Sequence, residues 1–383
     1  MSKPSVHDDD ALRLILDTVD RFVDRHIPID ELRRRDRDHE PPFDLMPMLG
    51  AAGLLGLPFP ERYGGQSLPW SIVTRVEERL GYRASMLGTL FDTTVCFGGM
   101  SLMAYGNERQ RAELLPRMIR GEALFALALT EPGAGSDAGG IQTRAKKVDG
   151  GWRVTGRKTW SSNAKQATYM VTPCRTNPDA TGHHGITMML IPPDAAGVSM
   201  TELAKIGNAG LTSWDIGLDE VFVTDDDVMG EVDRGFYNLM STLHYARAGL
   251  AASAAGQAQH AVDITIQHAQ TRIQFGQPIG SFQAVRHRLA DMQMRVDQAR
   301  LKTYHLADLI SADTPCRREA AQAKVIATET LLDVAGDGMQ ILASAGYASG
   351  SDMQRIWRDA RLYTFGEGTN DIQRDIIAKE LGL

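Results

Sequence analysis

The spacing of apolar residues changes twice along the chain, and this change limits the possible folds more than any other feature of the sequence. Between about residues 11 and 120, apolar side chains recur every three or four positions, which is the spacing of amphipathic helices. Between about residues 123 and 229 they fall into short runs typical of strands, and from residue 236 onward the helical spacing returns in long segments. The sequence therefore predicts an α+β chain in which a β domain separates two helical domains.

The predicted domains are an N-terminal all-α domain, a middle β domain and a C-terminal four-helix bundle, at residues 1–122, 123–232 and 233–383. In the middle domain, residues 145–155 are typical of a hairpin that turns at Asp149-Gly150-Gly151. In the last domain, one segment carries an apolar seam with alternating spacings of three and four: Phe282, Val285, Leu289, Met292, Val296 and Ala299. Such a seam could line a ligand groove, but packing in the core of a bundle is the interpretation that we favour.

Composition and charge exclude several classes of function. The chain has 383 residues, of which 43% are hydrophobic and 23% charged, as in a soluble globular protein. Its formal net charge of -7 disfavours nucleic acid or an anionic membrane as a partner. Its three cysteines and ten histidines form no set with metal-ligand spacing, so we expect no metal site and a reducing compartment. The acidic start has no targeting pattern, and the apolar run near residues 48–60 is too short to span a bilayer, so we expect a cytoplasmic protein with no membrane contact.

A glycine-rich segment, residues 129–137, follows a short apolar strand pattern. Its small residues allow the backbone to approach a ligand closely, its N–H groups can surround an anion or a carbonyl oxygen, and Thr130 and Ser136 add hydroxyl groups. A dinucleotide-binding glycine loop would have to open a helix, whereas residues 141–155 have a strand pattern, so we reject that alternative. A plain structural turn stays open as the other interpretation.

Three further segments carry residues suited to a flat, phosphate-bearing ligand. Trp160, followed by Ser161 and Ser162 at a strand end, can stack on a heterocycle and hydrogen-bond its edge, or belong to the core. Residues 272–280 interrupt two long helices with an arginine and a phenylalanine, which suits a phosphate beside a planar ring or a simple helix connection. Arg247 stands early in a helix rich in alanine, where it is either an anion contact or a solvated residue.

Glu367 is the candidate with the clearest chemical use. Apolar residues and glycine precede it in the run 363–369, and a helix start follows it. A carboxylate in that position can be kept from water and aimed by a rigid helix, and both conditions favour a general base. By itself, a glutamate before a glycine is more often a solvated loop residue, so this interpretation depends on the motifs that accompany it.

Taken in order, these motifs resemble those of the acyl-CoA dehydrogenase family of FAD-dependent flavoproteins. The resemblance covers nearly the whole chain, because matching short motifs occur in all three predicted domains. The matching residues are Pro60-Glu61-Arg62-Tyr63-Gly64-Gly65, Gly106, Gln110, Leu115-Pro116, Gly121-Glu122, Thr130-Glu131-Pro132-Gly133-Ala134-Gly135-Ser136-Asp137, Arg272, Phe275-Gly276, Gln283-Ala284, Gln340, Glu367-Gly368-Thr369 and Ile372-Gln373. Each motif alone is weak, whereas their ordered occurrence is specific.

The resemblance implies that FAD lies between the β domain and the C-terminal bundle. The residues that match positions around the flavin or elsewhere on FAD are Leu127, Ala128, Leu129, Thr130, Gly135, Ser136, Trp160, Ser161, Ser162, Thr369 and Asp371. A second set is implied to reach the adenine dinucleotide half of FAD in a neighbouring subunit: Arg272, Gln274, Phe275, Phe282, Gln283, Gln340 and Ser344. A homo-oligomer, either a dimer or a tetramer, is therefore expected.

The resemblance also implies a reaction. Glu367 matches the base that removes the α-proton of an acyl-CoA thioester, while the β-hydrogen leaves as hydride to flavin N5 and the trans-2-enoyl-CoA forms. Hydrogen bonds from a flavin ribityl hydroxyl and from the backbone N–H of the glutamate would stabilise the developing enolate. Other residues that match or border substrate contacts are Ser136, His244, Arg247, Gly366 and Gly368. The expected electron acceptor is an electron-transfer flavoprotein.

The chain departs from the family pattern at three places. Gly366 stands where an aromatic residue is usual, which should widen the pocket beside the reacting carbons and predicts a branched or bulky acyl group. The alternative is that Phe365 repacks and fills the space. Ala343-Ser344 replaces a usual pair of glycines near the dinucleotide, and His244 stands where a carboxylate is common.

Two other functions compete with an acyl-CoA dehydrogenase. Some proteins of the same fold carry out oxygen-dependent or eliminative chemistry, so a flavin-dependent acyl-CoA oxidase, monooxygenase or eliminative enzyme is the alternative. Those relatives often lack the glutamate, and the presence of Glu367 favours the dehydrogenase. The remaining alternative is a non-catalytic scaffold that binds acyl-CoA or flavin, and a colourless purified protein that takes up no FAD would favour it.

Overall fold

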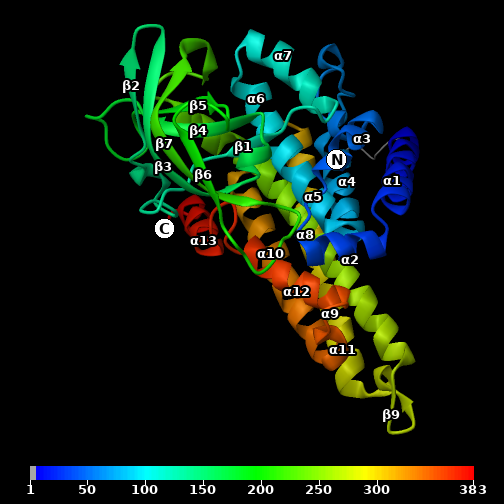
Figure 1. The fold of residues 1–383 in the computed structure, drawn as a ribbon. Coiled ribbons are helices and arrows are strands. Elements are labelled where there is room, and N and C mark those ends of the chain that lie inside the picture. The colour runs from blue at the N-terminus through cyan, green and yellow to red at the C-terminus, as the bar shows by residue number, and fades with distance from the viewer. Residues whose placement is uncertain (1–5) are drawn as a thin grey trace.

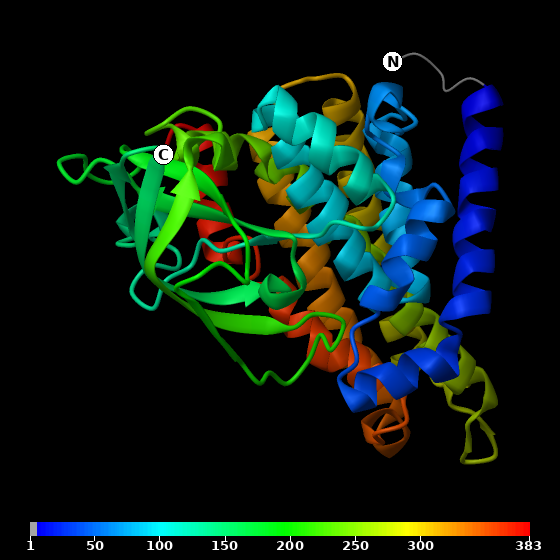
Figure 2. The same cartoon turned by 45° about the horizontal axis from the view of Figure 1, so that its top comes forward.

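The computed structural model describes residues 6–383, which form a helical N-terminal part, a twisted β-sheet and a long C-terminal bundle (Figure 1). The sheet lies beside one end of the bundle, and the other end of the bundle projects away from it (Figure 1). Figure 2 shows the N-terminal helices packed along the bundle on the side away from the sheet. The predicted α+β class, with a helical, a β and a helical domain, is confirmed. The predicted boundaries between the three domains, at residues 122/123 and 232/233, stay a prediction.

The N-terminal part is built from helices joined by turns and, between α3 and α4, by a longer segment with two 3-10 helices: α1 (Val6–His26), α2 (Ile29–Asp38), α3 (Met46–Ala51), α4 (Trp70–Arg83), α5 (Ser85–Phe91), the π-helix η4 (Asp92–Gly99), α6 (Met100–Tyr105) and α7 (Glu108–Ile119). A capping box starts α7, because Asn107 Oδ1 accepts a hydrogen bond from the Gln110 N–H at 2.8 Å and Gln110 Oε1 accepts one from the Asn107 N–H at 2.9 Å. The Gln110 amide also donates to the carbonyl oxygens of Asp226, at 2.8 Å, and Val228, at 3.1 Å. The start of α7 therefore fastens the helical part to the β domain.

The middle part is a mostly antiparallel sheet made of β1 (Phe125–Leu127), β2 (Arg144–Val148), β3 (Gly151–Ser162), β4 (Tyr169–Arg175), β5 (Ile186–Ile191), β6 (Val198–Glu202), β7 (Ser213–Thr224) and β8 (Val228–Met229). The strand order is β6-β7-β3-β2-β4-β5-β8, and β1 pairs with β4 in parallel. The predicted hairpin is the pair β2–β3, and Gly150 in its turn has a φ of +71°, which glycine adopts without strain. Only the short 3-10 turn Ala138–Gly140 follows the glycine-rich segment, so the rejection of a helix-opening dinucleotide loop is confirmed.

The C-terminal part contains α8 (Gly235–Thr271), the small hairpin of β9 (Ile273–Gln274) and β10 (Gln277–Pro278), α9 (Gln283–Ser311), α10 (Arg317–Leu342), α11 (Ser344–Tyr347), α12 (Asp352–Tyr363) and α13 (Asn370–Glu380). Small residues on α8 allow neighbouring helices to approach closely, since a methyl group on Gly256 would overlap the carbonyl oxygen of Glu78 in α4. On α9, the second half of the predicted seam, Met292 to Ala299, is fully buried, as expected for core packing. The first half, from Phe282 to Leu289, is only half-buried.

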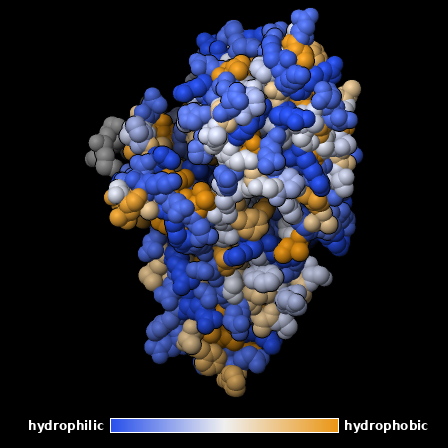
Figure 3. All heavy atoms as spheres, turned by 90° about the vertical axis from the view of Figure 1, so that its left-hand side faces the viewer, coloured by the Kyte–Doolittle hydropathy of each residue, from blue (hydrophilic) through white to orange (hydrophobic). Residues whose placement is uncertain are grey.

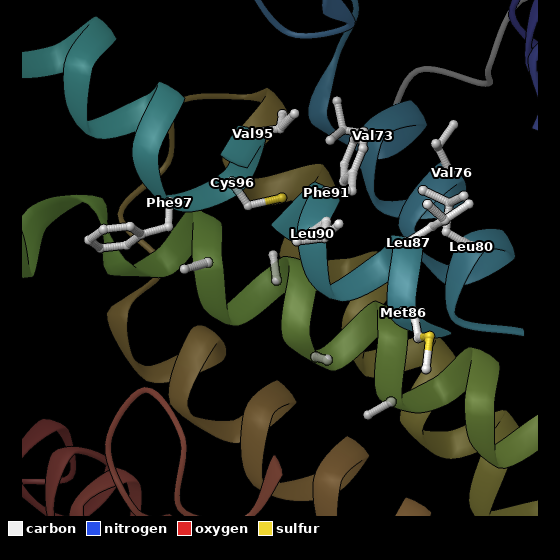
Figure 4. Close-up of a cluster of buried hydrophobic side chains, with 14 of the residues drawn as sticks. Val73, Val76, Leu80, Met86, Leu87, Leu90, Phe91, Val95, Cys96 and Phe97 are labelled. Carbon is white, nitrogen blue, oxygen red and sulfur yellow. The ribbon is translucent and has the colours of Figure 1, made fainter. Parts of the chain in front are cut away.

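Apolar side chains of α4, α5 and η4 pack together beside α8 and form much of the helical core (Figure 4).

In the part of the chain that the structure describes, one helical stretch, Ser85–Tyr105, is long and apolar enough to cross a membrane, but 78% of its apolar window is buried inside the protein. It is longer than the run near residues 48–60 that the sequence pattern singled out. Burial of this extent is typical of a core helix, and Asp92 is the single charged residue in the stretch.

Candidate active site

Glu367 lies in the short loop between α12, which ends at Tyr363, and α13, which begins at Asn370. The hydroxyl group of Thr369 accepts a hydrogen bond from the Ile372 N–H at 3.2 Å and caps α13. Glu367 has a φ of +55°, a left-handed conformation that costs a non-glycine residue energy and is concentrated at functional sites. The helix cap and this backbone conformation together determine where the carboxylate points.

The Glu367 carboxylate points into the protein interior. Its Oε2 is buried and accepts no hydrogen bond from an amide, a hydroxyl group or a basic side chain of the described residues. Burial raises the pKa of Glu367 above its ordinary value, while a hydrogen bond with Asp92 and the charges of Lys324 and Arg247 act in the opposite direction. A carboxylate with a raised pKa is a stronger base near neutral pH, so the arrangement suits proton abstraction.

Lys324 of α10 supports the loop that carries Glu367. Its fully buried ammonium group donates to the carbonyl oxygen of Gly368 at 3.0 Å and to Asn370 Oδ1 at 2.8 Å. The Asn370 amide in turn donates to Thr328 Oγ1 at 3.1 Å. Burial lowers the pKa of Lys324 to about 8, although the nearby charge of Glu367 opposes this change. The cation therefore fixes the loop to α10 and places a positive charge near the carboxylate.

Arg247, on α8, is a second buried cation near Glu367. Its side chain is 7% exposed, its Nε has no hydrogen-bond partner, and it makes no ion pair within the described residues. Burial lowers the pKa of Arg247 to about 10, and the charge of Glu367 opposes that change. A guanidinium without an ion pair keeps donors free for a polar group of a ligand. His244, also predicted to contact substrate, packs against Tyr245 with ring centroids 4.0 Å apart, and burial lowers its pKa.

In the β domain, two hydrogen bonds place the predicted flavin-contacting segments side by side. The Ala128 N–H donates to the carbonyl oxygen of Val171 at 2.9 Å, and the Thr159 N–H donates to that of Thr130 at 2.8 Å. Residues 127–130 therefore run next to the end of β3, which carries the other predicted segment, residues 160–162.

A buried ion pair lies directly beneath these segments. Lys158 is fully buried, and its Nζ donates to Glu131 Oε1 at 2.8 Å and to the carbonyl oxygens of Pro173 at 2.9 Å and Leu129 at 3.2 Å. The Glu131 carboxylate also accepts the N–H of Thr143 at 2.9 Å. The Lys158 charge helps to hold the pKa of Glu131 below its usual value, against the effect of burial. This pair connects the start of the glycine-rich segment to two strands of the sheet.

Several side chains of the same segments are exposed to solvent. Trp160 is 57% exposed and has a φ of +56°, at a register shift in the pairing of β3 with β7. Gly135 and Ser136 are exposed, and the hydroxyl group of Ser161 is buried without a partner. An exposed indole beside small residues fits one face of a planar ring system. Among the residues that the structure describes, no three histidine, cysteine, aspartate or glutamate side chains gather as a metal site.

The predicted cofactor residues of the second set lie at the far end of the bundle, around the β9–β10 hairpin and α11, away from the sheet (Figures 1 and 2), whereas Thr369 and Asp371 lie at the start of α13. Phe282 is half-buried, and the others are exposed: Arg272, Gln274, Phe275, Gln283, Gln340 and Ser344. Within one chain the structure therefore does not bring this set together with residues 127–136 and 160–162.

Family models cover almost the whole chain. The acyl-CoA dehydrogenase N-terminal domain matches residues 9–122, the middle domain matches residues 126–221 and the C-terminal domain matches residues 233–382. The chain belongs to the acyl-CoA dehydrogenase family. The resemblance inferred from the motifs is confirmed, and the protein is an acyl-CoA dehydrogenase-type oxidoreductase with FAD as its cofactor.

Several known proteins align with this acyl-CoA dehydrogenase over nearly their full length. It is 36% identical over 347 residues to the probable acyl-CoA dehydrogenase YngJ of Bacillus subtilis (strain 168), with 90% of this chain and 91% of that protein covered. It is 32% identical over 378 residues to the mitochondrial isovaleryl-CoA dehydrogenase of Solanum tuberosum, with 97% and 91% covered. Among solved structures, butyryl-CoA dehydrogenase from Megasphaera elsdenii has a TM-score of 0.95 and 28% identity, and both chains are covered completely.

The sequence pattern did not single out four charged residues around the site of this acyl-CoA dehydrogenase: Glu77, Asp92, Lys158 and Lys324. All four are buried. These residues could have been found from the sequence, because each stands at a position where the spacing of the neighbouring apolar residues predicts a buried, apolar side chain. Lys158, for example, continues the inward-facing alternation of Trp152 and Val154 along β3.

Proposed function

We propose that this acyl-CoA dehydrogenase converts an acyl-CoA thioester to the trans-2-enoyl-CoA, with Glu367 as the base that removes the α-proton. The observation that carries the proposal is the Glu367 carboxylate, whose buried Oε2 accepts no hydrogen bond from an amide, a hydroxyl group or a basic side chain of the described residues and which has two cations nearby. The α-proton of a thioester is too weakly acidic to leave without a base and without stabilisation of the enolate. Burial strengthens Glu367 as a base, while Arg247 and Lys324 favour its charged form before substrate enters.

The thioester carbonyl needs a hydrogen-bond donor as the α-proton leaves. The backbone N–H of Glu367 donates to no group of the described residues, so it is free for this oxygen. FAD, when bound, supplies the acceptor for the β-hydrogen, which leaves as hydride. The residues that would hold its ring system are those of segments 127–130 and 160–162, and the uncovered indole of Trp160 supports this assignment. Thr369 and Asp371, at the start of α13, are the proposed contacts beyond the ring.

The exposed end of the bundle supports a homo-oligomer in which each chain completes the FAD site of another. Phe275 is 93% exposed and Tyr347 is 76% exposed, which is costly for aromatic side chains in water. The first three apolar residues of the seam, Phe282, Val285 and Leu289, are half-buried in a single chain, as expected for a seam that a second chain covers. On the face drawn in Figure 3, hydrophobic side chains form small separate patches, some of them at this narrow lower end. Light scattering of the purified protein measures whether it is a dimer or a tetramer.

The test of the reaction is anaerobic reduction of the bound flavin by acyl-CoA thioesters. We expect rapid bleaching of the flavin absorbance and formation of one enoyl-CoA per flavin. Turnover with an electron-transfer flavoprotein, and slow reoxidation by oxygen, identify a dehydrogenase. Fast reoxidation by oxygen with hydrogen peroxide as product would instead support the oxidase alternative, and a protein without flavin would support a scaffold.

Gly366 supports a proposal about the acyl group. A Cβ at this position would contact only the carbonyl oxygen of Leu362, at 3.4 Å, and Phe365 is 50% exposed and does not fill the space. We therefore expect branched or ring-bearing acyl-CoA thioesters to have the highest kcat/KM. Gly366→Tyr should lower kcat/KM for these substrates by about 10- to 100-fold, because a ring would occupy the space, and should spare straight-chain substrates.

Gly366→Ala is the graded control for this prediction, since a methyl group fits without overlap. It should leave both substrate classes near the wild-type rate. A panel of straight, branched and aromatic acyl-CoA thioesters measures the effect. Highest activity on straight chains in the wild type, or equal losses for both classes in Gly366→Tyr, would refute the proposed preference.

A further inference from the structure

Asp92 is a buried carboxyl group that the reaction proposed above does not use. It is 5% exposed, and it is the single charged residue of the apolar stretch Ser85–Tyr105. The helix widens into the π-helix η4 at this residue, and such widened turns are frequent at functional sites. A lone charge in a buried apolar helix costs several kcal/mol unless it gains a specific partner.

The carboxyl group of Asp92 is held against α8 next to the substrate-binding residues. A methyl group on Gly249 would overlap Asp92 Oδ1 and would lie 2.9 Å from Cys96 Sγ. Only a glycine at position 249 therefore lets the side chain lie across the α8 backbone. Gly249 is two residues beyond Arg247, so Asp92 reaches the same part of α8 as the proposed substrate contact.

Asp92 also faces the catalytic loop. The carboxyl groups of Asp92 and Glu367 lie within hydrogen-bond reach of each other, and the Cys96 thiol is a second hydrogen-bond neighbour of Asp92, which acts to lower its pKa. Asp92 Oδ1 and Glu367 Oε2 are buried and accept no hydrogen bond from an amide, a hydroxyl group or a basic side chain of the described residues. Two carboxylates in contact and away from water cannot both keep a negative charge, so the pair must hold a proton.

The surrounding groups determine which carboxyl group keeps that proton. Burial raises the pKa of Asp92 well above its ordinary value, and the negative charges of Glu367 and Glu77 add to this effect. Glu77, from α4, is itself fully buried, and both its oxygens lack partners. Glu367 is the member of the pair that faces the cations Arg247 of α8 and Lys324 of α10. The charged member of the pair is therefore Glu367.

We propose that Asp92 stays protonated and donates its hydrogen bond to the Glu367 carboxylate, as a positioning residue for the catalytic base. The proposal rests on the assignment of Glu367 as the base. The hydrogen bond would hold the Glu367 carboxylate in one orientation. It would also keep that carboxylate charged when an entering acyl chain removes water, which otherwise favours the neutral form.

The test compares Asp92→Leu, which removes the donor, with Asp92→Asn, whose amide can still donate. The pH profile of kcat/KM reports the pKa of the base in the free enzyme. Loss of the donor destabilises ionised Glu367 and raises its pKa, so the acidic limb of the profile should move up by about 1–2 pH units in Asp92→Leu. In Asp92→Asn the limb should stay near its wild-type position. An unmoved limb in Asp92→Leu, or equal movement in both variants, would overturn the proposal, as would a rise in KM alone.

A second measurement does not depend on turnover or on the folding of Asp92→Leu. Infrared spectra of the wild-type holoenzyme near neutral pH should contain the C=O stretching band of protonated carboxyl groups. The substitution Asp92→Asn should remove the part of that band's absorbance that comes from Asp92. Glu77→Gln is the matched control, since Glu77 is the other buried carboxyl group with a strongly raised pKa and should remove a separate part. A spectrum that Asp92→Asn leaves unchanged contradicts the proposal. If no acyl-CoA bleaches the flavin, the proposed function fails while this spectrum still tests the protonation of Asp92.

Discussion

Glu367→Gln should bind FAD and acyl-CoA like the wild type and should reduce its flavin more slowly by a factor on the order of 10³ to 10⁴, which lies within the range found for loss of a general base. Glutamine has almost the same shape as glutamate, so the loop between α12 and α13 should keep its structure. The amide of the glutamine, unlike the carboxylate, cannot accept the α-proton. Anaerobic stopped-flow measurement of flavin bleaching by an acyl-CoA isolates this step from the electron acceptor.

Glu202→Gln is the control for this substitution, because Glu202 is an exposed glutamate in β6, far in the sequence from the loop between α12 and α13 that carries Glu367. It should bleach at the wild-type rate. Fast bleaching that survives in Glu367→Gln would show that another group removes the proton, and the assignment of the base would then be wrong. Retained binding of acyl-CoA in the slow variant separates loss of chemistry from loss of affinity.

Lys158→Met should lower the free energy of unfolding by about 3–5 kcal/mol and weaken FAD binding, because it leaves the Glu131 carboxylate buried without its cation. The carbonyl oxygens of Pro173 and Leu129 would lose the same donor. The ion pair lies beneath segments 127–130 and 160–162, which are proposed to hold the flavin. Loss of the ion pair should therefore disorder these segments as well as the sheet. Urea unfolding and the FAD content of the purified variant measure the two effects.

Two comparisons make this prediction specific. Lys147→Met removes an exposed ion pair with Asp225, in which the side chains are 52% and 53% exposed, and should cost about 0–1 kcal/mol. The double variant Lys158→Met/Glu131→Gln removes both buried charges and should recover part of the stability lost in Lys158→Met alone. Equal losses in Lys158→Met and Lys147→Met would contradict the assigned role of the buried pair.

Much of the fold and part of the site could be predicted from the sequence, because their signals are local. The change between helical and strand-like spacing is visible in short windows and predicted the three-part architecture. The hairpin at Gly150 was predictable since its turn needs a residue that tolerates a positive φ. The short strands β6 and β8 were not predicted, because exposed or two-residue strands carry almost no alternating pattern.

For the site, the ordered motifs indicated the family and Glu367, because each motif is a run of neighbouring residues that keeps its spacing. The roles of the individual cofactor and substrate residues stay predictions. The structure changed how Arg247 is understood. From sequence it was either an anion contact or a solvated helix residue, and its 7% exposure removes the solvated alternative.

Local sequence patterns were enough to predict the family, the α+β architecture and the position of the candidate base. The charged side chains near that base, namely Asp92, Glu77 and Lys324, became visible only in the folded chain, as did the ion pair beneath the segments proposed to hold the flavin. The physical reason is that the burial and pKa of a charged group are set by all the groups packed around it. Those groups come from α4, η4, α8, α10 and the loop before α13, which lie far apart in the sequence and meet only in the folded chain.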